Sequence, residues 1–247
     1  MSYRWLLPIL CLLLGACGHA PPRQTNPLAQ WEPSPNFDER RPIVIVIHAT
    51  EQESVARSLR TLSTRNSGGP VSAHYLVGAD GALYQLVEDS RRAWHAGGGS
   101  WGTIDDLNSA SIGIELDNDG TEAFPPAQVD ALLRLLDDLC TRLRIPRHAV
   151  IAHADMAPTR KRDPGALFPW AQLAHAGYGL WPDPADGEPP AGFDPWLALQ
   201  AIGYPLDDPA ATVRAYRRHF RGDEAGELDA QDHRILHSLV LQARRLR

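Results

Sequence analysis

The order of apolar and polar residues predicts both strands and helices in the first two thirds of the chain. Residues 43–47 form a continuous β-branched run, which is typical of a strand buried on both faces. Residues 111–116 alternate instead, so one face of that strand carries Ser111, Gly113 and Glu115 and the other is apolar. Residues 150–152 form a third short apolar run. These runs predict the strands of a sheet.

Helices are predicted between the strands. Apolar residues between 129 and 143 recur at helical spacing, and the prolines just before them suit a first helical turn. Residues 71–77 and 82–87 are strand candidates joined by a Gly-Ala-Asp-Gly turn, which predicts a hairpin. The predicted fold is therefore α/β, with a mixed central sheet flanked by helices.

The last quarter of the chain has a different pattern. Residues 181–192 are rich in Pro and Gly and predict a linker, so we expect the main domain to occupy residues 37–180. Three short helical patterns follow, each starting at an aspartate that can cap it: Asp194, Asp208 and Asp229. We expect a small all-α domain over residues 193–247.

The beginning of the chain indicates export. Residues 1–17 hold an early arginine, an apolar run too short to cross a bilayer, and small residues before Cys17. Residues 18–36 are rich in Pro and polar groups, which predicts an extended tether. One interpretation of this segment is a soluble secreted protein in which the cysteine at position 17 occurs by chance.

Net charge and cysteine content restrict the classes of partner and the roles that the cysteines can have. The net charge of −6 and the lack of a basic domain give no reason to expect nucleic acid as a partner. Beyond Cys17 only Cys140 remains, and it lies on the apolar stripe of the long helix, where a buried hydrophobic role is expected. We expect a monomer, since neither heptads nor long flat strands occur.

Two of the ten histidines stand directly after predicted strands. His48 and His153 each follow an apolar run, and Asp163 comes ten residues later between two prolines. Two histidines and a carboxylate are a common ligand set for catalytic zinc. On spacing alone the alternative, that these are hydrogen-bonded structural histidines, stays open, because no short zinc motif is present.

Several segments resemble the zinc amidases that hydrolyse the N-acetylmuramoyl-L-alanine bond. They appear in that family's order and cover most of residues 42–174. The segments are VIVIHAT (44–50), SAHYLV (72–77), AWHAG (93–97), SIGIEL (111–116) and VIAHADMAPTRKRDPGALFPW (150–170). The likeness is strongest to outer-membrane lipoprotein amidases of Gram-negative bacteria, which also carry a helical C-terminal domain.

The resemblance implies a role for particular residues. His48, His153 and Asp163 would hold one zinc ion, Glu115 would deprotonate the attacking water, and Lys161 would face the developing oxyanion. Besides these, Ala49, Thr50 and His95 are candidates for substrate contacts. We expect a structural role for His74 and a surface position for the six remaining histidines: His19, His148, His175, His219, His233 and His237.

Two further likenesses concern the ends of the chain. Leu14-Gly15-Ala16-Cys17 resembles the lipobox of bacterial lipoproteins, which implies lipid on Cys17 and, with Gly18 rather than Asp next, the outer membrane. LQAIGY (199–204) and VRAYRRHF (213–220) resemble pieces of three-helix peptidoglycan-binding domains. A helical cap that only stabilises the catalytic domain is the alternative for that region.

The expected activity is hydrolysis of the muramoyl–L-alanine amide in peptidoglycan or muropeptides, for cell-wall turnover or recycling. A second possibility is a peptidoglycan receptor without activity, although the chain keeps all three ligands expected from the resemblance. A third possibility is an amidase that acts on another acyl–amino conjugate.

Overall fold

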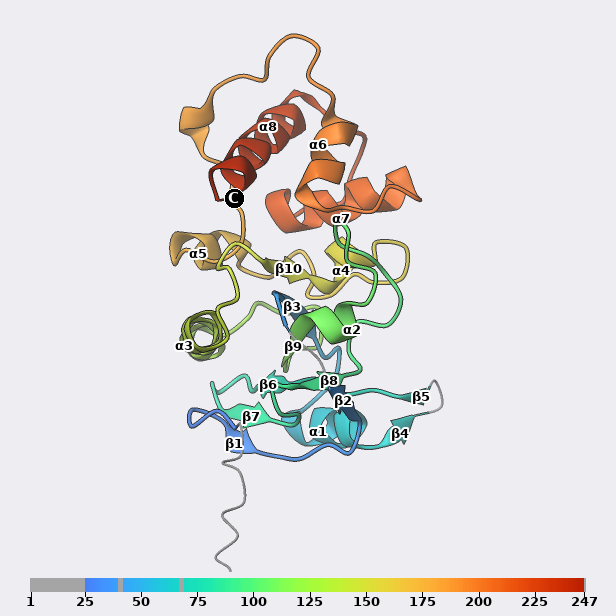
Figure 1. The fold of residues 1–247 in the computed structure, drawn as a ribbon, viewed down its shortest axis with the longest axis vertical. Helices are drawn as coiled ribbons and strands as arrows, with labels where there is room; N and C mark the ends of the chain where they lie inside the picture. The colour runs from blue at the N-terminus through green and yellow to red at the C-terminus, as the bar shows by residue number, and fades with distance from the viewer. Residues whose placement is uncertain (1–24, 40–41, 67–68, 247) are drawn as a thin grey trace, which may run out of the picture.

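The computed structural model describes residues 25–39, 42–66 and 69–246. A six-stranded sheet has the order β1-β7-β6-β9-β3-β10 (Figure 1). Only β6 and β7, the predicted hairpin, are antiparallel, and the other neighbours are parallel, so the sheet is mixed as expected. The strands are β1 (Gln30–Trp31), β3 (Val44–Ala49), β6 (Tyr75–Val77), β7 (Leu83–Gln85), β9 (Ser111–Leu116) and β10 (Val150–Ala152).

Strands β3 and β9, which are neighbours in the sheet, send alternate residues to opposite faces. Ile45 and Ile47 of β3 pack in one cluster with leucines of the long helix α3 (Pro126–Arg142), as do Ile112 and Ile114 of β9. Val44 and Val46 belong to a different cluster, together with Met156. This period of two places the even-numbered residues of β3 and the odd-numbered residues of β9 on the face away from α3. His48 and Glu115 both belong to these sets.

The remaining elements are short. Strands β2 (Phe37–Glu39) and β8 (Arg91–Ala93) form one small sheet, and β4 (Arg65–Asn66) and β5 (Gly69–Pro70) form another. The other helices of the first part are α1 (Val55–Ser63), α2 (Leu107–Ala110), α4 (His153–Met156) and α5 (Trp170–His175), and a 3-10 turn, Pro184–Asp186, follows.

Three helices form the C-terminal part, beyond the β10 edge of the sheet (Figure 1). They are α6 (Pro195–Ile202), α7 (Pro209–Arg221) and α8 (Ala230–Arg245). Each begins where an aspartate predicted it would. Asp194 accepts a hydrogen bond from Trp196 N at 2.9 Å, Asp208 from Ala211 N at 2.9 Å, and Asp229 from Gln231 N at 2.8 Å.

The segment predicted as a tether, residues 18–36, packs against the domain over its described part, residues 25–36. Strand β1 pairs in parallel with β7 and so covers the edge of the sheet. Asn26 and Ser34 are buried, and their side chains donate hydrogen bonds to Asp138 Oδ2 at 2.8 Å and to Leu62 O at 3.1 Å. The composition did not predict this packing, because it depends on a few polar side chains whose partners are distant in the sequence. Residues 1–24, including Cys17, lie outside the described residues.

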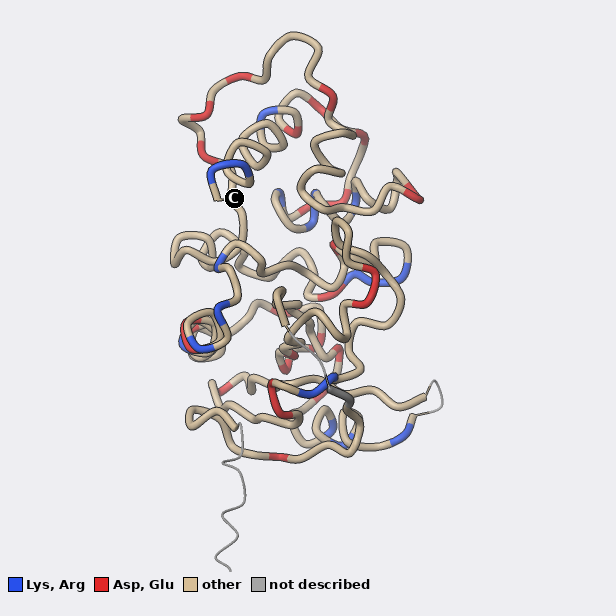
Figure 2. The backbone as a smooth tube through the Cα atoms, in the orientation of Figure 1, with Lys and Arg blue, Asp and Glu red and all other residues tan. Residues whose placement is uncertain are grey.

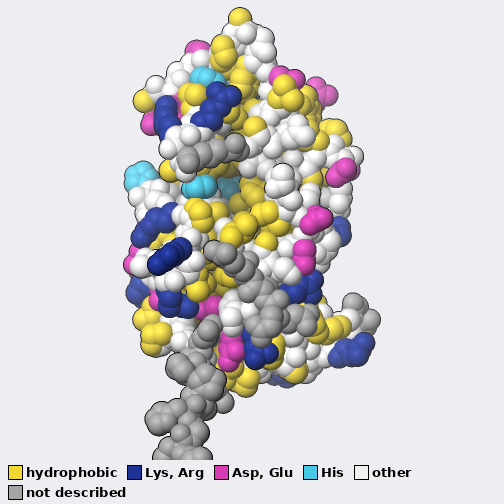
Figure 3. Space-filling view, viewed as in Figure 1, with side chains coloured by type: hydrophobic (Ala, Val, Ile, Leu, Met, Phe, Trp, Pro, Cys, Tyr) yellow, Lys and Arg dark blue, Asp and Glu magenta, His cyan; other side chains and the backbone are white. Residues whose placement is uncertain are grey.

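Charged side chains are spread along the molecule. In Figure 2, lysines and arginines occur on several elements of both parts, with acidic residues among them. The face in Figure 3 likewise shows both signs of charge interspersed with hydrophobic side chains. Within the described part of the chain, no helix combines the length and the apolar character that a bilayer crossing would require.

Candidate active site and metal centre

The parallel pairing of β3 with β9 builds one side of the site. Their register places His48 opposite Glu115 and Val46 opposite Gly113. Because both strands alternate with the same period, His48 and Glu115 project from the same face of the sheet. Two residues 67 positions apart in sequence thus become neighbours through backbone register.

The edge strand β10 brings in the second histidine. Ala152 pairs with Ile47 of β3, so the next residues of the two strands, His153 and His48, lie side by side. His153 is also the first residue of α4. The loop after α4 then folds back, and Ala154 N donates to Asp163 O at 3.0 Å, which anchors Asp163 beside this turn.

Three buried ligand atoms converge at this point. His48 Nδ1 lies 2.8 Å from His153 Nδ1 and 3.2 Å from Asp163 Oδ2. His153 Nδ1 lies 3.0 Å from the same oxygen. The three residues are between 2% and 7% exposed. Such a group could hold a metal ion, and two imidazoles with one carboxylate suit zinc and leave a fourth position open.

The outer nitrogens of both rings support this reading. His153 Nε2 lies 3.0 Å from Ala96 O, and since a carbonyl only accepts, Nε2 carries the proton. The lone pair of His153 is then on Nδ1, the atom that faces His48 and Asp163. His48 Nε2 also has a partner, the Nδ1 atom of His95 at 3.0 Å. Partners of this kind fix the tautomer that a metal ligand needs.

The ionisation states suit a cation as well. Burial, followed by the charge of the nearby His153, lowers the pKa of His48 to about 4, so His48 is neutral at neutral pH. Burial alone would raise the pKa of Asp163, but its interactions with His153 and His48 outweigh burial and hold it below the usual range. Neutral imidazoles and an ionised carboxylate are the forms that bind metal.

The carboxyl group of Glu115 also lies at this centre. Its Oε2 is shielded from solvent and has no hydrogen-bond partner among the described residues. Burial, followed by the charge of Asp163, raises the pKa of Glu115 to about 8, although Lys161 acts in the opposite direction. A carboxyl group in such surroundings can exchange a proton near neutral pH.

A pocket of about 170 Å³ opens onto these groups. The structure brings together every candidate of the sequence analysis that lies in its described part. They are His48, Ala49, Thr50, His95, Glu115, His153, Lys161 and Asp163. Thr50 also donates its hydroxyl to Asn118 O at 3.4 Å. Substrate contact by Ala49, Thr50 and His95 stays a prediction.

The His95 ring fills the space beside Gly113. A Cβ on Gly113 would lie 2.4 Å from this ring. The ring is held between His48 and Ser111, whose Oγ lies 3.3 Å from His95 Nε2. The absent side chain therefore accommodates a histidine that supports His48. His74 has the structural role predicted, accepting from Gly113 N at 3.0 Å.

Sequence reasoning missed part of the site. Gln52, Thr61 and Val71 also line the pocket, and no pattern in the sequence marked them as site residues. Trp94 lines it too, and it lies in the AWHAG segment without having been assigned a role. The expectation of a surface position was wrong for His219, which is 6% exposed. It stacks on Trp170 because α7 packs over the turn that carries His153.

Comparison with known proteins gives consistent results. Residues 38–166 match the family model described as N-acetylmuramoyl-L-alanine amidase. The amidase AmiD of Escherichia coli is 37% identical over 230 residues, covering 80% of this chain and 82% of AmiD. The amidase AmpD of Citrobacter freundii is 41% identical over 103 residues, covering 42% of this chain and 55% of AmpD.

Solved structures extend the likeness to the C-terminal helices. AmiD in complex with its substrate anhydro-N-acetylmuramic acid-L-Ala-D-γ-Glu-L-Lys superposes with a TM-score of 0.72 at 36% identity, covering 83% of this chain and 90% of AmiD. AmpDh3 of Pseudomonas aeruginosa gives 0.72 at 33% identity, covering 83% and 93%. The convergent ligand atoms and these matches confirm the predicted kinship: the chain is an enzyme of the N-acetylmuramoyl-L-alanine amidase family.

Proposed function

We propose that this enzyme uses one zinc ion, held by His48, His153 and Asp163, to cleave the amide between N-acetylmuramic acid and L-alanine of the stem peptide. The observation that carries the proposal is the convergence of three buried ligand atoms within 4.8 Å. The substrate class is supported by AmiD, whose solved complex contains a compound with this linkage. Both peptidoglycan and free muropeptides present the bond.

The surrounding residues suit amide hydrolysis. Bound zinc would lower the pKa of a water toward about 7 and polarise the amide carbonyl. Glu115, opposite His48, would take the proton of the attacking water and return it to the leaving amine. Lys161 lines the same pocket, and its ammonium would stabilise the negative charge that develops on the carbonyl oxygen.

Attachment to the outer membrane through lipid on Cys17 is part of the proposal. It is supported by the lipobox-like sequence before Cys17. An enzyme held on the periplasmic side of that membrane would lie next to peptidoglycan. We expect Cys17→Ser to abolish incorporation of labelled palmitate and to leave the unprocessed precursor. Undiminished labelling of the variant would contradict the anchor.

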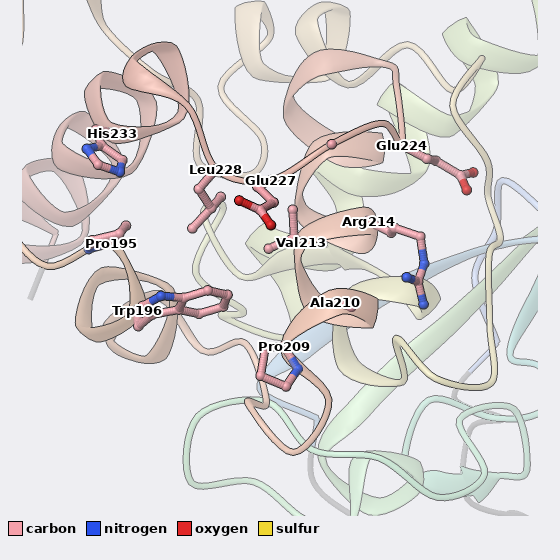
Figure 4. Close-up of a pocket in the computed structure, with 11 residues that line it drawn as sticks. Pro195, Trp196, Pro209, Ala210, Val213, Arg214, Glu224, Glu227, Leu228 and His233 are labelled. Carbon is pink, nitrogen blue, oxygen red and sulfur yellow. The ribbon is translucent and has the colours of Figure 1, made fainter.

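For the C-terminal helices we propose binding to peptidoglycan. They enclose a pocket of about 620 Å³. Figure 4 shows the Trp196 indole extending toward Val213 and Leu228, with Arg214 and Glu224 farther along the pocket. An aromatic ring beside charged groups can stack on sugar faces and bind peptide charges. This pocket is separate from the metal centre, since the two share no lining residue.

One experiment tests the bond, the metal and the reaction together. The chain from residue 18 onward, which keeps every described residue, is incubated with muropeptides with and without a chelator. Mass spectrometry should find stem peptide that begins at L-alanine, absent after chelation and restored by zinc. A folded, zinc-loaded protein that releases no such peptide would favour the receptor alternative or a different amide substrate.

A further inference from the structure

The carboxylate of Asp155 is fully buried and receives three hydrogen bonds. Ala152 N donates to its Oδ2 at 2.8 Å, and His219 Nδ1 lies 2.6 Å from the same oxygen. The Tyr204 hydroxyl donates to Oδ1 at 2.8 Å. Two of these three partners belong to the C-terminal part of the chain, so the carboxylate joins the two parts of the molecule.

Asp155 also belongs to the turn that presents a metal ligand. Helix α4 has four residues, starts with His153, and is too short to be stable without outside contacts. Its N-cap residue is Ala152, which has no polar side chain to cap the turn. Asp155 makes the reciprocal bond to the backbone of Ala152 and so closes the first turn, directly beside His153.

The two C-terminal partners of Asp155 are themselves held firmly. The His219 ring stacks on Trp170 with centroids 3.8 Å apart and on Phe220 at 4.2 Å. The Tyr204 ring packs edge-on against Trp101 at 4.9 Å. Figure 1 shows α7, which carries His219, lying against α4. Without these donors the Asp155 carboxylate would keep its burial but lose most of its hydrogen bonds, which is unfavourable for a buried charge.

A second contact acts on the other ligand-bearing segment. Arg162, the residue before Asp163, donates to Glu224 Oε1 at 2.7 Å, and Arg218 Nε donates to the same oxygen at 2.9 Å. Arg162 is largely exposed, so this ion pair contributes less than the buried Asp155 group. Both contacts nevertheless run from the C-terminal part to the segment between His153 and Asp163.

We propose that Asp155 is a positioning residue through which the C-terminal helices, by way of Tyr204 and His219, hold His153 in its metal-binding orientation. The C-terminal part is then a component of the metal centre, in addition to any ligand that it binds. This inference rests on the proposed function only in taking His48, His153 and Asp163 as the zinc site.

The test compares two matched tyrosine variants of the full chain, purified in detergent. Tyr204→Phe removes the hydroxyl that bonds Asp155. Tyr216→Phe removes a hydroxyl from an equally buried tyrosine that bonds Asp232 O inside the C-terminal part. The zinc dissociation constant is measured by competition with a chromogenic chelator, and circular dichroism establishes that each metal-free protein is folded.

We expect Tyr204→Phe to weaken zinc binding by about 3- to 10-fold and Tyr216→Phe to leave it unchanged. Asp155→Ala should weaken it by about 10- to 100-fold, the usual effect of losing a residue that orients a ligand, and Asp155→Asn should restore part of the affinity. Where Asp155→Ala does not fold, the tyrosine pair decides. Wild-type zinc affinity in Tyr204→Phe, or equal loss in both tyrosine variants, would overturn the proposal.

The zinc-affinity test of Asp155 and the muropeptide test of the proposed function can fail independently. A wild-type chain that binds zinc but releases no stem peptide would refute the proposed reaction and leave the positioning role standing. An active, zinc-dependent wild type whose Tyr204→Phe variant binds zinc normally would refute the positioning role alone.

Discussion

At the scale of single residues, the surroundings of each histidine decide what it can do. His48 and His153 direct Nδ1 to a shared point, and each has a hydrogen-bonding partner at Nε2. His74 uses its Nδ1 to accept from the backbone of strand β9. His219 binds a buried carboxylate from another part of the chain. The same side chain thus serves as candidate ligand, sheet support and link between segments.

Removing the proton-transfer group should stop turnover and leave the metal site intact. Glu115→Gln keeps the size of the side chain but cannot take a proton. We expect kcat to fall by at least about 100-fold, the low end for general acid–base catalysis, while zinc affinity stays within about threefold. Steady-state cleavage of muropeptides and chelator competition measure the two quantities. Near-normal kcat would remove Glu115 from the mechanism.

The same substitution should change how the stability of the metal-free protein depends on pH. The pKa of Glu115 is raised from 4.5 to about 8, so between these values the folded state keeps a proton that the unfolded state has lost. Stability contributed by this group is present below pH 4.5 and is lost as pH rises to about 8. Urea unfolding in the presence of a chelator measures the free energy of unfolding of both proteins. The wild-type value should fall relative to that of Glu115→Gln across this window, by about 1.4 kcal/mol per pH unit. Parallel curves for the two proteins would contradict the burial of this carboxyl group.

At the scale of elements, the sequence predicted what local periodicity determines. The β-branched run before His48 and the alternation around Glu115 predicted strands β3 and β9, and the alternation also predicted which residues share a face with Glu115. Parallel register, which places His48 opposite Glu115, is a long-range property that no local pattern contains. Strand β1 has two residues, and its pairing depends on polar anchors distant in sequence, so composition suggested a tether instead.

Strand β9 offers a test of how closely the site is packed. Gly113→Ala would place a Cβ 2.4 Å from the His95 ring. The ring cannot move away freely because its two nitrogens contact His48 and Ser111. We expect His95 to shift, His48 to lose its Nε2 partner, and zinc affinity to fall by about 10- to 100-fold.

The control for this change is Gly98→Ala, in the loop after His95, where a Cβ would meet no atom within 4 Å. Its zinc affinity should equal that of the wild type. Equal zinc affinities in the wild type, Gly113→Ala and Gly98→Ala would mean that His95 does not support His48.

At the scale of the whole molecule, the sheet and the C-terminal helices form a continuous stack. The strands follow one another from β1 to β10, and the helices continue beyond β10 (Figure 1). This order puts the turn of α4, which carries His153, between the sheet and α7, where both parts can hold it. The pocket among α6, α7 and α8 shares no lining residue with the pocket at the metal centre. One C-terminal part can therefore brace the metal centre and bind a ligand of its own.

A ligand-binding role for that pocket can be separated from its bracing role by substituting a residue that contacts neither Asp155 nor the metal ligands. Trp196 lines the pocket and is 38% exposed, whereas its neighbour Leu197 is 63% exposed and does not line it. Because a stacked indole is a common anchor in binding sites, we expect Trp196→Ala to weaken binding to purified sacculi by about tenfold, or about 1.4 kcal/mol. Leu197→Ala should bind as the wild type does, and both variants should cleave soluble muropeptides at the wild-type rate, since the metal centre is untouched. Sedimentation with sacculi and a muropeptide assay measure the two activities. Wild-type sedimentation of Trp196→Ala would leave the C-terminal helices with the bracing role alone.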